Sequence, residues 1–101
     1  MLDIKTENPK RGDVYSINSS SKQVLIISND LMCKHSTHIN VLPIIDDYVV
    51  ATSSVTIHRS YLDKKTNEVS PEIMNKIGNS LHDLFVNNNQ NQSIILIEYI
   101  Q

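Results

Sequence analysis

Three side chains suited to phosphodiester chemistry stand at two places in the sequence. His58 and Arg59 are adjacent, and Lys22 stands two residues before the apolar run at residues 24–27. Cleavage of RNA through its 2′-hydroxyl needs a base for that proton, an acid for the leaving oxygen and a cation near the phosphate. Histidine titrates near neutral pH, and lysine or arginine supplies the charge. We therefore take Lys22, Arg59 and His58 as candidate catalytic residues. The opposing interpretation is that His58 and Arg59 are solvated groups at a strand end.

A second group of polar residues is a candidate surface for RNA or a protein partner: Lys10, Arg11, Lys22, Lys34, His35 and His38. The whole chain has 9 Lys and Arg against 11 Asp and Glu, which gives a net charge of −2. Its isoelectric point is about 6.0, whereas nucleic-acid-binding domains usually exceed about 9. Any contact with RNA is therefore expected in a local groove. The four tyrosines, Tyr15, Tyr48, Tyr61 and Tyr99, could stack on bases, although tyrosines more often lie at the rim of a core.

Neither a metal nor a cofactor is expected. Cys33, His35 and His38 lie close together, but a structural zinc site takes four ligands, usually as two spaced pairs. A polar loop is the preferred interpretation of this segment. The sequence has 2 glycines, and neither common glycine-rich phosphate-binding motif occurs. With 1 cysteine, no internal disulfide can form, which fits a reducing cytoplasm.

The elements that must position these residues are expected to be strands. The chain of 101 residues is near the usual size of one domain, so residues 1–101 are predicted as a single domain. Ile and Val dominate the apolar residues and favour strands. The expected strands cover residues 14–17, 23–28, 39–45, 48–51, 54–57 and a terminal segment within 93–101. Polar connections are expected at 18–21, 31–38 and 59–69, an N-terminal arm at 1–9, and an Asn/Gln-rich loop at 87–92. Pro43 lacks a ladder donor and is expected at a sheet edge or bulge.

One helix is predicted near the C-terminus, over residues 70–85. Ser70 is a suitable N-cap, Pro71 fits the first helical position, and Ile73 and Ile77 begin an apolar series at helical spacing. Gly78 inside this helix costs about 1 kcal/mol relative to alanine. One helix on five or six short strands predicts a small twisted sheet or a partly closed barrel. No apolar run approaches the roughly 20 residues that span a membrane, and the charged N-terminus does not resemble a secretory signal.

Several segments resemble the MazF/PemK toxin family, in divergent and shortened form. Residues 10–15 (KRGDVY) resemble its opening strand, residues 23–30 (QVLIISND) its second strand, and residues 40–44 (NVLPI) its third. Residues 70–85 are similar to its C-terminal helix. The resemblance implies a mainly β fold with one C-terminal α-helix, the SH3-like small barrel of this family. It also implies a cytoplasmic, homodimeric toxin of a toxin–antitoxin system, which cleaves single-stranded RNA in a sequence-dependent way. Its antitoxin occupies the RNA groove.

The same resemblance locates the expected active site, where this chain differs from the family. The family's catalytic arginine position is Lys22, and its catalytic threonine position is Ile45. Arg59 resembles the arginine that many members keep after a late strand. The first loop is reduced to residues 18–21. These differences leave an alternative function open, a catalytically silent binding module on the same scaffold. Such a protein of a phage or another mobile genetic element would bind and inhibit a host protein or nucleic acid.

Overall fold

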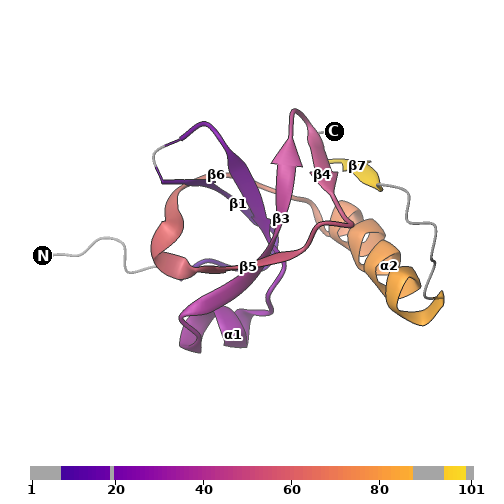
Figure 1. Ribbon diagram of the computed structural model, residues 1–101, viewed down its shortest axis with the longest axis horizontal. Coiled ribbons are helices and arrows are strands. Elements are labelled where there is room, and N and C mark those ends of the chain that lie inside the picture. Colours follow the sequence, from indigo (N-terminus) through magenta and orange to yellow (C-terminus); the bar gives the residue numbers. More distant parts are fainter. Residues whose placement is uncertain (1–7, 19, 88–94, 100–101) are drawn as a thin grey trace, which may run out of the picture.

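One antiparallel sheet carries the fold in the computed structural model, which describes residues 8–18, 20–87 and 95–99 (Figure 1). The strands follow one another in the order β6–β1–β2–β3–β4–β7, and β5 pairs with β3 off this path. The strands are β1 (Asp13–Ile17), β2 (Gln23–Ile26), β3 (His38–Ile45), β4 (Tyr48–Val50), β5 (Val55–His58), β6 (Leu62–Glu68) and β7 (Leu96–Glu98). The helices are α1 (Asp30–His35), the 3-10 turn η2 (Arg59–Tyr61) and α2 (Pro71–Asn87). The predicted mainly β class is confirmed, but among the described strands no pairing closes the sheet into a complete barrel.

Three segments differ from the sequence-based expectation. Residues 31–38 were expected to be a polar loop, but α1 forms there because the Asn29 side chain accepts a hydrogen bond from the Met32 N–H, 2.9 Å away. Residues 59–69 were also expected to be a connection and instead contain β6, whose residues beyond Leu62 are all exposed. Because β6 buries so little, it lacks the apolar alternation that reveals a strand. Asn87 was expected in the loop at 87–92 and is instead the last residue of α2; the rest of that predicted loop lies outside the described residues.

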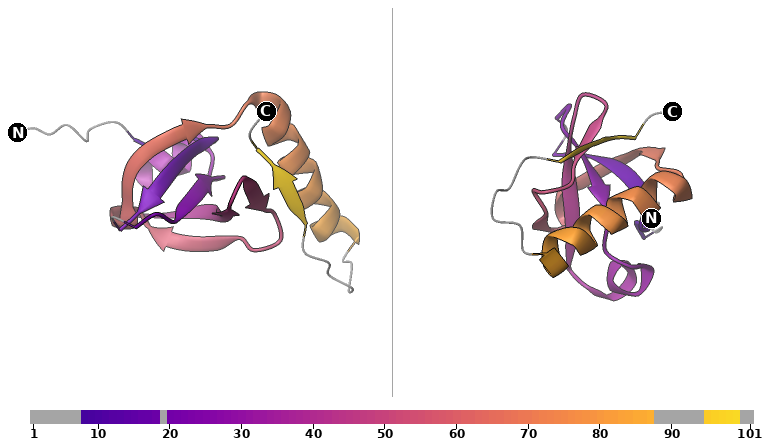
Figure 2. Two further views of the ribbon diagram at one scale, coloured as in Figure 1. Left: turned by 90° about the horizontal axis from the view of Figure 1, so that it is seen from above. Right: turned by 90° about the vertical axis from the view of Figure 1, so that its right-hand side faces the viewer.

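The sheet buries apolar side chains on both of its faces. On one face, α2 contributes Ile73 and Ile77, which pack against strand residues such as Leu25, Leu42 and Val49. Figure 2 shows α2 running alongside β7 on this side. On the other face, the curled sheet encloses a second cluster of Val24, Ile26, Cys33, Ile39 and Val41. Successive side chains of β2 and β3 point to opposite faces of the sheet. The apolar residues of each strand are therefore divided between the two clusters.

Gly12 fixes the turn that leads into β1. Its φ of 98° is a conformation that side chains rarely adopt. Its N–H donates to the Ile26 carbonyl at 2.9 Å, and its own carbonyl accepts from the Val69 N–H at 2.8 Å. The glycine therefore ties the end of β2 to the segment that begins α2. A geometric requirement of the turn explains why this residue of the KRGDVY segment is a glycine.

Gly78 has no such requirement, so Gly78→Ala is expected to stabilise the protein by about 0.5–1 kcal/mol. Gly78 lies inside α2, and a methyl group built there would be no closer than 4.0 Å to another group, the Arg11 Nη2. The free energy of unfolding in urea would measure the gain. Gly12→Ala is the matched control and is expected to destabilise, because its φ is positive. A loss of stability in Gly78→Ala would show that Arg11 needs this space.

Candidate functional site

The two positions matched to the family's catalytic pair lie at one end of the sheet. Gln23 pairs with Ile44 between β2 and β3, so Lys22 and Ile45, one residue further on each strand, are neighbours. Both are exposed, and the side chain of Ile45 is 60% exposed. Among the described residues, no hydrogen bond or ion pair engages the Lys22 ammonium group. This end of the sheet can therefore offer a cation to a phosphate, but Ile45 offers no hydroxyl beside it.

The Arg59 side chain holds other parts of the protein together. From η2, its Nη1 donates to the carbonyl oxygens of Cys33 at 2.8 Å and Ser36 at 3.1 Å, and its Nη2 donates to Asn8 Oδ1 at 2.8 Å. The two carbonyls belong to the last turn and C-cap of α1, where a cation is favoured by the helix dipole. Arg59 therefore fastens α1 to the corner between β5 and β6.

His58 and His38 lie side by side across strands β5 and β3. They are direct partners in the pairing, and their ring centroids are 5.1 Å apart at an interplanar angle of 83°. His58 Nδ1 accepts the Ser60 N–H at 3.1 Å and caps η2. His38 Nδ1 lies 3.0 Å from Thr37 Oγ1. The histidine pair lies beside the first residue of β3, His38, whereas Lys22 lies beside its last residue, Ile45. The structure therefore does not bring Lys22 and His58 to one point.

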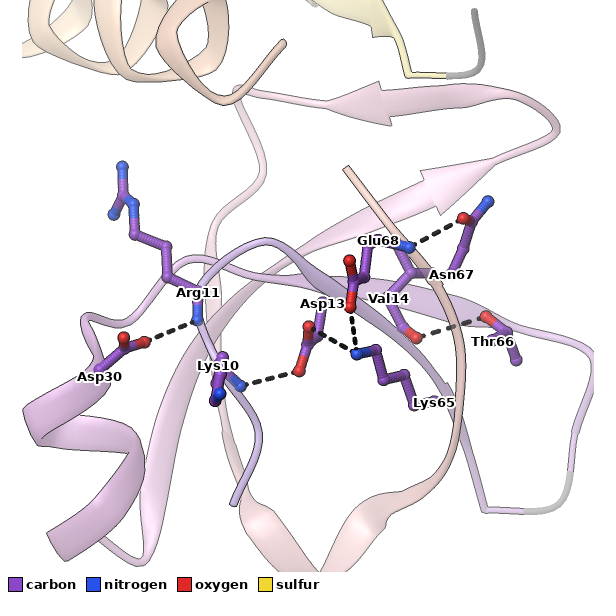
Figure 3. A network of polar contacts seen from close by, with 9 residues as sticks. All are labelled: Lys10, Arg11, Asp13, Val14, Asp30, Lys65, Thr66, Asn67 and Glu68. Carbon is purple, nitrogen blue, oxygen red and sulfur yellow. Dashed lines mark hydrogen bonds and ion pairs between the residues drawn. The ribbon is translucent and has the colours of Figure 1, made fainter. Parts of the chain in front are cut away.

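The other predicted binding residues are distributed over separate surfaces. Lys34 and His35 are exposed in the last turn of α1. Arg11 donates from Nη1 to the Ile27 carbonyl at 2.8 Å, and in Figure 3 its side chain points away from the neighbouring acidic and basic residues. Cys33 is fully buried, and burial raises the pKa of its thiol. Because Cys33 faces the core while His35 and His38 are exposed, these three do not form one set of ligands.

A network of charges joins the start of β1 to the end of β6 (Figure 3). The buried Asp13 accepts the Lys10 N–H at 2.9 Å and lies 3.4 Å from Lys65 Nζ. Lys65 also bonds to Glu68. This bond lowers the pKa of Glu68 and raises that of Lys65. Lys65 is thus shared between two carboxylates, and its charge is neutralised within the network.

A pocket of about 450 Å³ opens beside this network. Its lining residues come from the N-terminal segment, β1, η2 and β6: Pro9, Tyr15, Arg59, Ser60, Leu62, Asp63 and Lys65. Of these, Arg59 was predicted as a catalytic residue and Tyr15 as a stacking residue; the others were not predicted as site residues. Tyr15 pairs with Lys65 across β1 and β6. If residues 62–68 had been predicted as a strand paired with β1, Leu62, Asp63 and Lys65 would have been expected near Tyr15.

Tyr15 also connects the pocket to Lys22. Tyr15 pairs with Val24 and Ser16 with Gln23, and the Ile17 N–H donates to the Lys22 carbonyl at 3.2 Å. Lys22 therefore stands opposite Ile17, diagonal to Tyr15 and on the same face of the sheet. Such diagonal neighbours are about 7–8 Å apart. Tyr15 is thus near both cations, with Lys22 diagonal to it across β1 and β2 and Arg59 in the lining of the same pocket.

The fold of this chain is similar to that of solved endoribonucleases. Neither a family model nor a curated protein matches this sequence. A mycobacterial endoribonuclease in complex with its cognate antitoxin superposes with a TM-score of 0.71 and 24% identity, over 79% of this chain and 95% of that one. A second mycobacterial endoribonuclease gives a TM-score of 0.67 and 25% identity, over 78% and 92%. Within the described part of the chain, no helix is long and apolar enough to cross a membrane.

Proposed function

We propose that this chain, which has the MazF/PemK-like toxin fold, is the ribonuclease toxin of a toxin–antitoxin pair and acts on single-stranded RNA. The observation that carries the proposal is the similarity over most of the chain to an endoribonuclease bound to its cognate antitoxin. A second endoribonuclease has the same fold. The proposed protein is a single domain that works in the cytoplasm as a homodimer, and an antitoxin covers its RNA-binding face.

Lys22 is the residue proposed to bind the scissile phosphate. It is exposed, its ammonium is not engaged by another described residue, and the sequence resemblance matches it to the family's catalytic arginine. A lysine neutralises charge as a point cation, without the two parallel hydrogen bonds that arginine can form. Neither Ile45 beside it nor the distant His58 is placed to move a proton at this phosphate. We therefore propose slow cleavage, in which solvent water takes the 2′-hydroxyl proton and protonates the leaving 5′-oxygen, while Lys22 stabilises the charge that develops on the phosphate in the transition state.

A silent binding module is the second candidate, and two observations favour it. Ile45 exposes an apolar side chain where the family has its catalytic threonine. Arg59, the other candidate cation, uses its guanidinium to hold α1 in place. On this alternative the same surface binds RNA or a host protein without cleaving it.

Cleavage of a labelled single-stranded RNA by the full chain tests the proposal. Lys22→Ala is expected to lower kcat/KM about 100-fold, the usual effect of losing one group that stabilises the charged transition state. Lys76→Ala, an exposed lysine on α2, is the matched control and should leave the rate unchanged. Circular dichroism would verify that both variants fold.

The other outcomes separate the two candidates. RNA that binds to the wild-type chain but remains intact from pH 5 to 9 would favour the silent module. Equal cleavage by wild type and Lys22→Ala would remove Lys22 from the mechanism and point to a contaminating nuclease.

A further inference from the structure

We propose that the pocket between β1, η2 and β6 binds one nucleotide of a single-stranded RNA, with the base against Tyr15 and the phosphate on Arg59. The inference rests on the proposed function and deepens it by adding a substrate subsite beside Lys22. The volume of about 450 Å³ lies within the usual range of small-ligand sites. Pro9, Tyr15 and Leu62 give the pocket an apolar wall, which suits a flat ring.

Arg59 supplies the positive charge of this pocket. Its three acceptors, the carbonyls of Cys33 and Ser36 and the side-chain oxygen of Asn8, are all neutral. Among the described residues, no carboxylate forms an ion pair with it. These bonds also leave N–H donors of the guanidinium unused. A fixed, partly buried cation with donors to spare is suited to an anionic oxygen.

The remaining charged groups favour a nucleotide over a simple anion. Lys65 is already shared between Asp13 and Glu68, so mainly the carbon stem of its side chain is available to a ligand. Asp63 adds a carboxylate to the lining, and none of the described residues bonds to its side chain. That carboxylate would repel a bare phosphate, but it would accept hydrogen bonds from a base carrying N–H groups. A nucleotide offers both the anion for Arg59 and the donors for Asp63.

The position of the pocket relative to Lys22 suits consecutive nucleotides of one strand. Tyr15 is diagonal to Lys22 on the same sheet face, at about 7–8 Å. This spacing is short enough for one RNA chain to contact both residues. The RNA strand would then contact Lys22, Tyr15 and Arg59. The pocket would hold the nucleotide next to the phosphate that binds Lys22.

Titration of the isotope-labelled full chain with 5′-GMP, 5′-CMP and inorganic phosphate, followed by amide NMR shifts, tests the pocket. We expect saturable shifts at Tyr15, Ser60 and Leu62 with either nucleotide, and at least tenfold weaker binding of phosphate. Asp63→Asn should weaken nucleotide binding about fivefold and strengthen phosphate binding. Asp83→Asn, an exposed carboxylate on α2, is the control and should change neither.

Three results would overturn the inference: no shifts in the pocket, phosphate binding as tightly as the nucleotides, or tighter nucleotide binding by Asp63→Asn. The last two would indicate a simple anion site. Cleavage of RNA by the wild-type chain is measured in parallel. Cleavage without nucleotide binding refutes only the pocket, whereas nucleotide binding without cleavage refutes only the ribonuclease activity.

Discussion

Changing Lys22 to arginine and Ile45 to threonine together is expected to raise the rate of RNA cleavage about 100-fold. The two positions are neighbours, because Lys22 directly precedes β2 and Ile45 ends β3, the strand paired with it. Arginine would hold two phosphate oxygens at once, and the threonine hydroxyl would place a hydrogen-bond donor beside the same phosphate, where one donor to the developing charge contributes about 10²–10³-fold. The measurement is kcat/KM on a fluorogenic single-stranded RNA.

Lys22→Arg combined with Ile45→Val is the matched control for this gain. Valine has nearly the shape of threonine without its hydroxyl, and Ile45 is 60% exposed, so neither substitution disturbs a core. Equal rates for the threonine and valine variants would show that position 45 takes no part in the chemistry. The surface would then be better explained as a binding site.

Arg59→Lys is expected to lower the free energy of unfolding by about 2–3 kcal/mol. A lysine cannot reach the carbonyls of Cys33 and Ser36 and the side chain of Asn8 together, and hydrogen bonds to charged groups contribute about 1.5–3 kcal/mol each. The expected loss of stability is smaller than the sum of the three hydrogen-bond energies, because the bonds act as a unit and the site is partly exposed. Urea unfolding followed by circular dichroism gives the value.

Lys64→Ala, an exposed residue of β6, provides the comparison and should change stability by less than about 0.5 kcal/mol. If Arg59→Lys retained full stability but lost cleavage, Arg59 would belong to the chemistry as the sequence analysis predicted. Loss of stability with cleavage retained under native conditions would support the fastening role.

Local sequence signals predicted the buried part of this fold well. β2, β3 and α2 were found because their apolar residues follow the periodicity of buried elements. Pro43 was expected at an edge or bulge, and it lies where β3 changes partner, between β5 on Val41 and β4 on Ile44. β6 was missed because an exposed strand leaves no apolar pattern, and α1 because one cap and one buried cysteine are weak signals.

The candidate site was harder to predict because its contacts join distant parts of the chain. Lys22 and Ile45 were paired by the family resemblance, and the pairing of β2 with β3 brings them together. The bonds of Arg59 cross 23, 26 and 51 residues, and no local pattern encodes such partners. The same holds for the pocket, whose walls meet only when β6 pairs with β1.

The pairing of β1 with β6 also has a consequence during synthesis. β1 can pair with β2, the next strand of the sequence, as soon as β2 has left the ribosome. Its other edge must wait until roughly fifty further residues are made, because Asp13 pairs with Glu68. The nascent chain therefore carries an open strand edge until β6 has been made. Asp13 at the start of that edge is the type of charged residue that discourages pairing with other chains.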